Sequence, residues 1–184
     1  YEVDTRAPSV ISFTLSPTAL KAGGNATVTL VFSEEVASFS AADITVANLD
    51  NGTTSGTLPT MTSINNITWT GTFTPTANTE DASNTLSLKT SYTDTAGNAG
   101  PAAITVNYAI DTLLPSVSSI VISSATGLQN SFLNAGDVLS VTVTFSENVP
   151  VTDTPQLTLA VGDDYRTATY ASSDNGGTTL VFQY

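Results

Sequence analysis

The chain contains the same sequence motif twice, and this internal repeat restricts the possible folds more than any other feature. Asp4 and Asp111 each begin an Asp-Thr-x-x-Pro segment, and each copy continues with a Leu-x-Ala-Gly turn and a β-like stretch that ends in Phe-Ser-Glu. The matched segments, first copy before second, are residues 4–8 and 111–115, 20–23 and 133–136, and 28–34 and 141–147. The second copy has a longer first loop, around residues 124–130. One structural unit per copy is the simplest interpretation.

Apolar and polar residues alternate with the two-residue period of a half-buried β-strand in both copies. The pattern occurs in residues 26–32, 67–73, 86–92, 104–110 and 139–145, and turns rich in Gly, Asn and Asp separate these runs. No stretch has helical periodicity, although residues 38–43 have room for a single helical turn. Short strands with regular turns and no long helix predict an all-β fold of antiparallel β-sandwiches.

The expected strands also predict the domain boundaries. The first copy has about seven strands, at residues 10–15, 26–32, two between 44 and 61, 67–73, 86–92 and 104–110. The second copy reaches only the fifth strand, at residues 178–184, so the sixth and seventh strands, F and G of a sandwich lettered A to G, are absent from it. We therefore expect residues 1–7 to be the end of a preceding repeat with its linker, 8–110 a complete sandwich, and 111–184 a linker with a partial second sandwich. Because such a sandwich has an uncovered core, we expect its missing strands in the continuation of the chain or in another chain.

The composition excludes several classes of function. The chain has no Cys and no His, which excludes disulfides, thiolate zinc sites, cysteine nucleophiles and the Ser-His-Asp triad. The formal net charge of −12 opposes binding to nucleic acids or insertion at anionic membranes, because both require a basic face. An acidic surface instead attracts divalent cations. Adjacent carboxylates such as Glu34 and Glu35 point to opposite faces of a strand and do not form a glycosidase pair, so we expect no enzymatic activity.

The order of the strands brings acidic residues together at one pole of the first sandwich. With alternating strand directions, the chain before the first strand, the loop after the second and the loop after the sixth all lie at the same end. The residues expected there are Asp4, Glu34, Glu35, Asp94 and Asn98, and their counterparts in the second copy are Asp111, Glu147 and Asn148. Packed carboxylates repel one another, and oxygen ligands favour Ca²⁺ over zinc, so we interpret these residues as candidate calcium ligands. Solvated surface acids, or an Asp94 that bonds the backbone of its own hairpin, are the alternatives.

A family resemblance rests on residues 4–8 (DTRAP), 19–23 (ALKAG), 32–34 (FSE), 44–46 (ITV) and 92–100 (YTDTAGNAG). Together these segments resemble the bacterial Ig-like domains that are strung along large biofilm-associated and RTX-type surface adhesins. The resemblance implies immunoglobulin-like β-sandwiches on the bacterial cell surface, with neighbouring repeats of the same chain as partners. It also implies Ca²⁺ at the junctions between domains, and a cell-surface or glycan target bound through other domains. We therefore expect a calcium-stiffened spacer and adhesion module.

An accessory carbohydrate-binding module of a secreted enzyme is the alternative function. Such a module needs a strip of solvent-exposed aromatic side chains, for which Trp69, Tyr165 and Tyr170 are the candidates. Trp69 shares its strand face with Ile67 and Phe73, however, which favours a place in the core. Repeated Thr-x-Thr runs are compatible with a flat ice-binding face, but outward-facing threonines are ordinary on sandwich strands.

Overall fold

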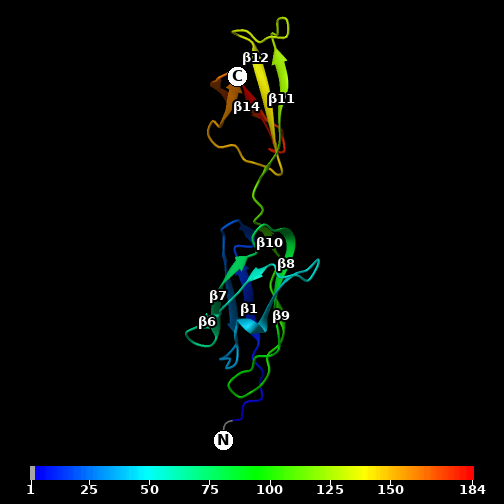
Figure 1. The fold of residues 1–184 in the computed structure, drawn as a ribbon. Coiled ribbons are helices and arrows are strands. Elements are labelled where there is room, and N and C mark those ends of the chain that lie inside the picture. Colours follow the sequence, from blue (N-terminus) through cyan, green and yellow to red (C-terminus); the bar gives the residue numbers. More distant parts are fainter. Residues whose placement is uncertain (1–2) are drawn as a thin grey trace. The chain divides into compact units, whose positions relative to one another are not determined.

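The computed structural model describes residues 3–184, which divide into two compact units after Leu114 (Figure 1). Unit 1 comprises the residues up to Leu114, and unit 2 comprises Pro115–Tyr184. Tyr1 and Glu2, which we expected to belong to a preceding repeat, lie outside the described residues. Apart from one short 3-10 turn, the regular elements are all β-strands. None of the described residues forms a helix long and apolar enough to cross a bilayer.

Unit 1 consists of two five-stranded sheets. The first sheet has the order β1-β3-β7-β5, with β6 also paired to β7, and its strand pairs are antiparallel. The second has the order β2-β10-β8-β4, with β9 also paired to β8, and its β2–β10 pair is parallel. The bounds of the first sheet are β1 (Val10–Ser16), β3 (Ala26–Phe32), β5 (Gly56–Thr57), β6 (Thr62–Ser63) and β7 (Thr68–Pro75). Those of the second are β2 (Ala19–Lys21), β4 (Ile44–Asn48), β8 (Glu80–Leu88), β9 (Ala103–Ile104) and β10 (Tyr108–Asp111).

The inward faces of these two sheets form one core, as the sequence alternation predicts. Val28, Leu30 and Phe32 of β3 are fully buried, whereas Thr29 and Val31 between them are half-buried. Phe73 of β7 meets Tyr108 of β10 across the core, with ring centroids 5.3 Å apart. Burial of one such side chain contributes about 1.5–3 kcal/mol. The two-residue alternation therefore favours the strand conformation, and burial of the apolar side chains that it places on one face stabilises the packing of the two sheets.

Some strands of unit 1 differ from the expected positions. The sixth strand, expected at residues 86–92, is β8 (Glu80–Leu88), and Tyr92 lies in the loop that follows it. The beginning of β8 is polar and shows no apolar alternation, but its backbone pairs with β10. The seventh strand, expected at residues 104–110, is divided into β9 and β10. The short strand β2 was not expected, because its partner β10 is distant in sequence and no local alternation reveals a three-residue parallel pair.

A 3-10 turn at Ala41–Asp43 lies within residues 38–43, where the sequence has room for a single helical turn. Asp43 is buried, and its Oδ2 accepts hydrogen bonds from the backbone N–H of Ser40 (2.8 Å) and from the Ser40 hydroxyl (3.3 Å). Its Oδ1 accepts a further hydrogen bond from the hydroxyl of Ser91. One carboxylate thus joins this turn to the loop after β8.

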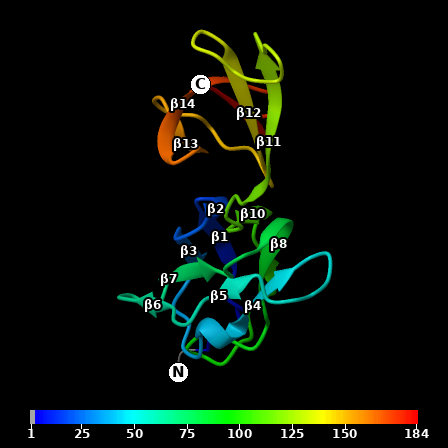
Figure 2. The same ribbon diagram turned by 45° about the horizontal axis from the view of Figure 1, so that its top comes forward.

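Unit 2 contains one five-stranded antiparallel sheet with the order β11-β12-β15-β14-β13. Strands β11, β12, β13 and β14 are labelled in Figure 2. The strands are β11 (Val117–Thr126), β12 (Val138–Phe145), β13 (Gln156–Val161), β14 (Asp164–Ser173) and β15 (Thr179–Gln183). A small core forms around Val143, Leu180 and Phe182, with Tyr170 packed against it. The additional residues of the second copy lengthen β11 and the turn that follows it.

Candidate metal site

Two loops at one pole of unit 1 are held side by side by backbone hydrogen bonds. Val36, which follows β3, forms an isolated antiparallel bridge with Asp94, which follows β8. The N–H of Ala37 donates to the carbonyl of Thr93 at 2.9 Å. These bonds fix the position of Asp94 relative to Glu34, although the two residues are far apart in sequence.

The segment before β1 is attached to the same pole by a pair of reciprocal hydrogen bonds, which we call the serine clasp. The N–H of Ser33 donates to the carbonyl of Ser9, and the N–H of Ser9 donates to Oγ of Ser33, both at 2.9 Å. The clasp recurs in unit 2, where the N–H of Ser146 donates to the carbonyl of Ser116 (2.8 Å) and the N–H of Ser116 to Oγ of Ser146 (3.0 Å). The serine of the recurring Phe-Ser-Glu tripeptide therefore has a structural role, which the spacing of the motif does not reveal.

Asp94 is almost completely buried, and its carboxylate organises the loop that contains it. Its Oδ1 accepts the N–H groups of Ala96 and Asn98, each at 2.8 Å, and its Oδ2 accepts the side-chain N–H of Asn98 at 2.8 Å. Gly97 has a φ of +95°, which suits glycine in this tight turn. The prediction that Asp94 bonds the backbone of its own hairpin is therefore confirmed.

Asn98 connects this loop to the segment that enters unit 1. Its Nδ2 also lies within hydrogen-bond distance of the carbonyls of Asp4 (3.3 Å) and Arg6 (3.2 Å). Asp4 in turn accepts the N–H of Arg6 through Oδ1 at 2.9 Å. The side-chain nitrogen of Asn98 is thus directed at Asp94 and at the entering segment, so in this arrangement Asn98 positions the acidic residues.

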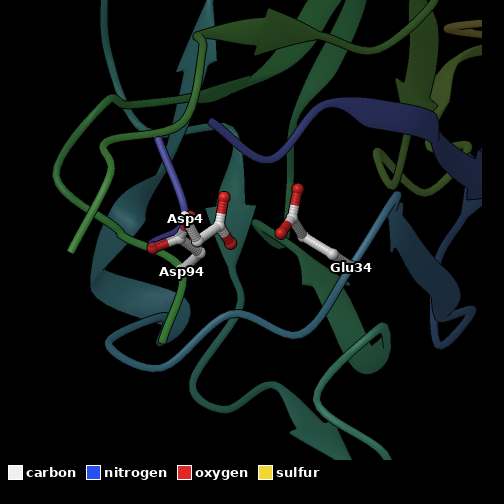
Figure 3. A group of neighbouring side chains, drawn as sticks. All are labelled: Asp4, Glu34 and Asp94. Atoms are coloured by element: carbon white, nitrogen blue, oxygen red, sulfur yellow. The ribbon is translucent and has the colours of Figure 1, made fainter. Parts of the chain in front are cut away.

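Asp4, Glu34 and Asp94 form a group that we call the acidic cluster (Figure 3). One carboxylate oxygen of each residue lies within 4.8 Å of one oxygen of each of the others. Asp4 is exposed, Glu34 is half-buried and Asp94 is buried, so the cluster extends from solvent to the loop interior. The ion pair found among residues 3–184, between Arg166 and Asp164, lies in unit 2 and does not neutralise this charge.

The other predicted ligands do not join the acidic cluster. Glu35 is exposed beside Glu34 and outside the group. Asp111 is the last residue of β10, and its strand partners are Lys21 of β2 and Glu80 of β8. This position in unit 1 is away from the acidic cluster. Glu147 is half-buried in unit 2, where its Oε1 has no hydrogen-bond partner among the described residues, and Asn148 is exposed. Within residues 3–184, these second-copy residues form no comparable group of three acids.

The pKa of Asp94 lies below its ordinary value of 3.8, chiefly because the side-chain N–H of Asn98 stabilises the charged form, while burial acts in the opposite direction. A carboxylate whose pKa is lower in the folded state stabilises the fold above its unfolded pKa, and this contribution is lost as the pH falls through the folded value. We expect the melting temperature of the metal-free protein to decline below about pH 4. In a calorimetric pH series, the melting temperature of Asp94→Asn should decline less over this range. Asp50 is an exposed loop residue, so the melting temperature of Asp50→Asn should decline as much as that of the unsubstituted protein. Equal slopes for all three proteins would contradict this assignment.

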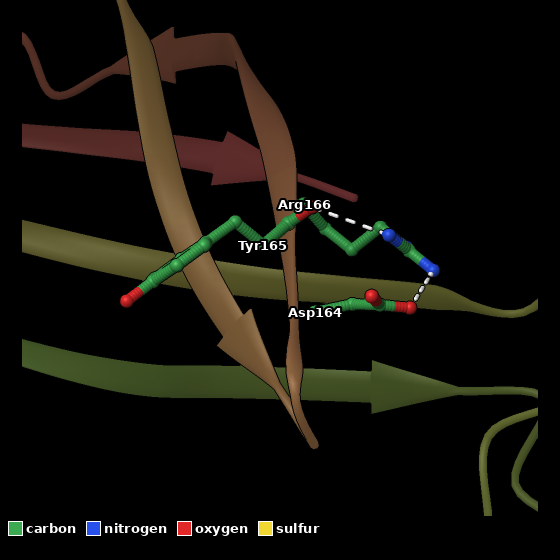
Figure 4. Close-up of polar contacts among 3 residues, drawn as sticks. All are labelled: Asp164, Tyr165 and Arg166. Atoms are coloured by element: carbon green, nitrogen blue, oxygen red, sulfur yellow. Dashed lines mark hydrogen bonds and ion pairs between the residues drawn. The ribbon is translucent and has the colours of Figure 1, made fainter.

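The aromatic candidates for carbohydrate binding do not form a strip. Trp69 is half-buried and packs edge-on against Phe39, with ring centroids 5.0 Å apart, and Tyr170 packs against Phe182. Tyr165 is largely exposed, and its ring points away from the Arg166–Asp164 ion pair (Figure 4). By strand alternation Tyr165 shares a face with Thr167, whereas the exposed Tyr184 shares the opposite face with Phe182. The exposed tyrosines of unit 2 therefore do not present a common surface.

Comparisons with known proteins give a family match and one structural similarity. A family model described as "Bacterial Ig-like domain" matches residues 4–110. No curated protein sequence matches the chain. Among solved structures, the chain is similar to the N-terminal part of the bacterial S-layer protein SbsC, with 15% sequence identity and a TM-score of 0.40. That comparison covers 96% of this chain and 44% of the other, so the chain spans less than half the length of the solved structure.

Proposed function

The chain belongs to the bacterial Ig-like domain family, and from this premise we propose that it is a spacer and adhesion module of a large secreted bacterial surface protein. Its partners in this proposal are neighbouring Ig-like repeats, and a cell-surface or glycan target is bound through other domains. The module has no enzymatic role. The acidic cluster, at the pole where the chain enters unit 1, is the observation that carries the proposal.

The acidic cluster has the chemistry of a calcium site. Its three carboxylates supply hard oxygen ligands, and Ca²⁺ takes six to eight of these with flexible geometry. Two of the three side chains, Asp4 and Glu34, accept no hydrogen bond from a basic side chain among the described residues, which leaves their charge available to a cation. Without a cation, carboxylates this close repel one another.

A cation in the acidic cluster would stiffen the module because of the elements that the cluster joins. Asp4 belongs to the segment before β1, Glu34 follows β3, and Asp94 follows β8 in the other sheet. Bound Ca²⁺ would therefore hold the entering segment to both sheets of unit 1 at once. In a tandem array, this contact restrains the bending of each repeat relative to the segment that precedes it.

Calcium is expected to raise the thermal stability of unit 1. At a free concentration about a hundredfold above the dissociation constant, binding to the folded state alone contributes about 2.7 kcal/mol, which corresponds to several degrees in melting temperature for a unit of this size. Differential scanning calorimetry in excess EGTA and in millimolar Ca²⁺ measures the shift. Asp4→Asn and Glu34→Gln should each abolish most of it.

Glu35→Gln is the matched control for these variants. Glu35 is adjacent to Glu34 but exposed and outside the acidic cluster, so its substitution removes the same charge without removing a proposed ligand. The variant should retain the full calcium-dependent shift. Melting curves that coincide with and without Ca²⁺, or a shift lost equally in Glu35→Gln, would remove the calcium part of the proposal.

The surface location has a separate test. Antibodies raised against residues 1–184 should label intact cells of the source bacterium, and brief protease treatment of those cells should remove the label. Fab fragments of the same antibodies should reduce attachment of the cells to their substratum if the repeats lie in an adhesive fibre. Label that becomes accessible only after cell lysis would refute the surface location while leaving the calcium proposal untouched.

A further inference from the structure

The tripeptide Asp-Asn-Gly occurs once in each unit, in an exposed turn. Residues 50–52 follow β4 in unit 1, and residues 174–176 connect β14 to β15 in unit 2. These turns contain the two Asn–Gly bonds of the sequence. An Asn–Gly bond is prone to deamidation, because glycine has no Cβ to hinder attack of its backbone nitrogen on the preceding side chain. The same three residues in two turns therefore allow a direct comparison of how structure controls this reaction.

The turn in unit 1 occupies both reacting groups with hydrogen bonds. The N–H of Gly52 donates to the carbonyl of Asn48 at 3.0 Å. The Oδ1 of Asn51 accepts the N–H of Thr53 at 2.9 Å and the Thr53 hydroxyl at 2.6 Å. The nitrogen that would attack and the side chain that would be attacked are thus each held by another partner. Reaction at Asn51 requires this turn to open first.

The turn in unit 2 leaves the same two groups free. Asn175 and Gly176 are the central residues of a turn that is closed by the N–H of Gly177, which donates to the carbonyl of Asp174 at 3.2 Å. Both central residues are exposed. Within residues 3–184, neither the N–H of Gly176 nor the side-chain amide of Asn175 has a hydrogen-bond partner. The reacting groups are therefore accessible to each other and to water.

The residues on either side of this tip are firmly held. Asp174 accepts the N–H of Thr179 through Oδ1 at 3.1 Å and the hydroxyl of Thr178 through Oδ2 at 2.9 Å. The carbonyl of Gly177 accepts the N–H of Val149 at 3.0 Å. A hydrogen-bonded base thus presents Asn175 and Gly176 to solvent.

The corresponding hairpin of unit 1, between β6 and β7, has an exposed tip as well. Asn66 corresponds to Gly177, because its carbonyl accepts the N–H of Val36 at 3.0 Å as that of Gly177 accepts the N–H of Val149. Both residues have left-handed backbones, with φ of +54° and +66°. At the tip of the unit 1 hairpin, Ile64 is fully exposed, although this unit contains two packed sheets. Exposure of the tip is therefore a property of this hairpin in both units.

We propose that Asn175 is a site of spontaneous deamidation in the folded protein, whereas Asn51 is protected by its turn. The backbone nitrogen of Gly176 forms a bond to Cγ of Asn175, and the side-chain nitrogen leaves as ammonia, which carries away the Gly176 amide proton. Water then opens the resulting succinimide at one of its two C–N bonds. Opening at Cγ gives aspartate, and opening at the backbone carbonyl gives isoaspartate. Either product adds one negative charge beside Asp174.

Isoaspartate changes the hairpin more than aspartate does. It adds one carbon to the backbone between Asp174 and Gly177, the two residues whose hydrogen bond closes the turn. The geometry of a tight turn depends on the number of backbone atoms within it, so this bond weakens. Slow reaction at Asn175 therefore loosens the connection between β14 and β15.

One incubation of the 184-residue chain at mildly alkaline pH measures both sites. Trypsin, which cleaves after Lys and Arg, gives the peptides 22–89 and 167–184, each with a single Asn–Gly bond. Mass spectrometry detects the gain of one dalton on deamidation, and a protein isoaspartyl methyltransferase labels the isoaspartate. We expect Asn175 to react at least about tenfold faster than Asn51, because the first turn must open before its asparagine reacts. A sample digested before incubation gives the background.

Gly176→Ala is the matched variant. A Cβ at this position meets only Oδ2 of Asp174, at 3.8 Å, so alanine fits the turn. Its methyl group hinders the attack, and the reaction at Asn175 should slow at least about tenfold. In concentrated urea, the unsubstituted protein should react at similar rates at Asn51 and Asn175, because the turns that distinguish them are lost.

Three results would overturn the proposal. The first is a rate at Asn51 in the folded protein that equals or exceeds the rate at Asn175. The second is an unchanged rate at Asn175 in Gly176→Ala. The third is reaction of Asn175 in urea but not in the folded protein, which would mean that its turn is protective too.

Discussion

Phe73→Ala is expected to lower the free energy of unfolding of unit 1 by about 3–5 kcal/mol. Phe73 has no exposed surface, and its ring lies between Tyr108 and Gly56, where any side chain at Gly56 would overlap the ring. The neighbours are residues of hydrogen-bonded sheets, so they cannot move to fill the space that alanine leaves. Urea unfolding followed by the fluorescence of Trp69, the single tryptophan of the chain, reports on unit 1 alone.

Ile64→Ala is the control for this substitution. Ile64 follows β6 and is fully exposed, so the variant should unfold within about 0.5 kcal/mol of the unsubstituted protein. Combining Phe73→Ala with Tyr108→Ala should cost less than the two single changes together, because the variants share one contact. A loss below about 1 kcal/mol for Phe73→Ala would mean that this part of the core repacks easily.

Asp43→Ala is expected to destabilise unit 1 by about 1.5–3 kcal/mol, which is the usual range for hydrogen bonds to a charged group. The change removes the acceptor for the N–H and hydroxyl of Ser40 and for the hydroxyl of Ser91. It therefore releases the 3-10 turn and detaches it from the loop after β8. Urea unfolding in excess EGTA, again followed by Trp69, measures the effect independently of any bound cation.

Two further variants separate the contributions to this effect. Ser91→Ala removes the link between the two loops but keeps the cap of the 3-10 turn, so it should cost less than Asp43→Ala. Asp50→Ala removes a carboxylate from an exposed turn and should change stability by no more than about 0.5 kcal/mol. If Asp43→Ala were as mild as Asp50→Ala, the connection made by the buried carboxylate would be without energetic consequence.

The features of this fold that depend on local alternation are predictable from the sequence. Strands β1, β3 and β7 follow from the period-2 pattern, because each buries one face and exposes the other. The polar beginning of β8 and the three-residue β2 depend on pairing with β10, which is distant in sequence, so no local pattern reveals them. The 3-10 turn lies in the one segment, residues 38–43, for which the sequence left room for a helical turn.

The acidic cluster was only partly predictable, for a related reason. Strand order alone placed Asp4, Glu34 and Asp94 at one pole, and the structure brings their carboxylates together. Which of two adjacent glutamates faces inwards depends on the path of a loop, so Glu34 and Glu35 could not be distinguished beforehand. The role of Asn98 in positioning the loop depends on the direction of its amide, which residue type and spacing do not determine.

The parallel pairing of β2 with β10 determines how unit 1 responds to pulling on its two ends. The chain enters before β1, and it leaves after β10, whose last residues lie beside Ala19, Leu20 and Lys21. Tension between these ends pulls β10 along its own axis, past β2. Strand β2 runs in the same direction as β10 and is connected to the other end of the unit through β1. The bonds between them are then loaded in shear and must break together instead of one at a time. A unit with this connectivity resists extension until it yields abruptly.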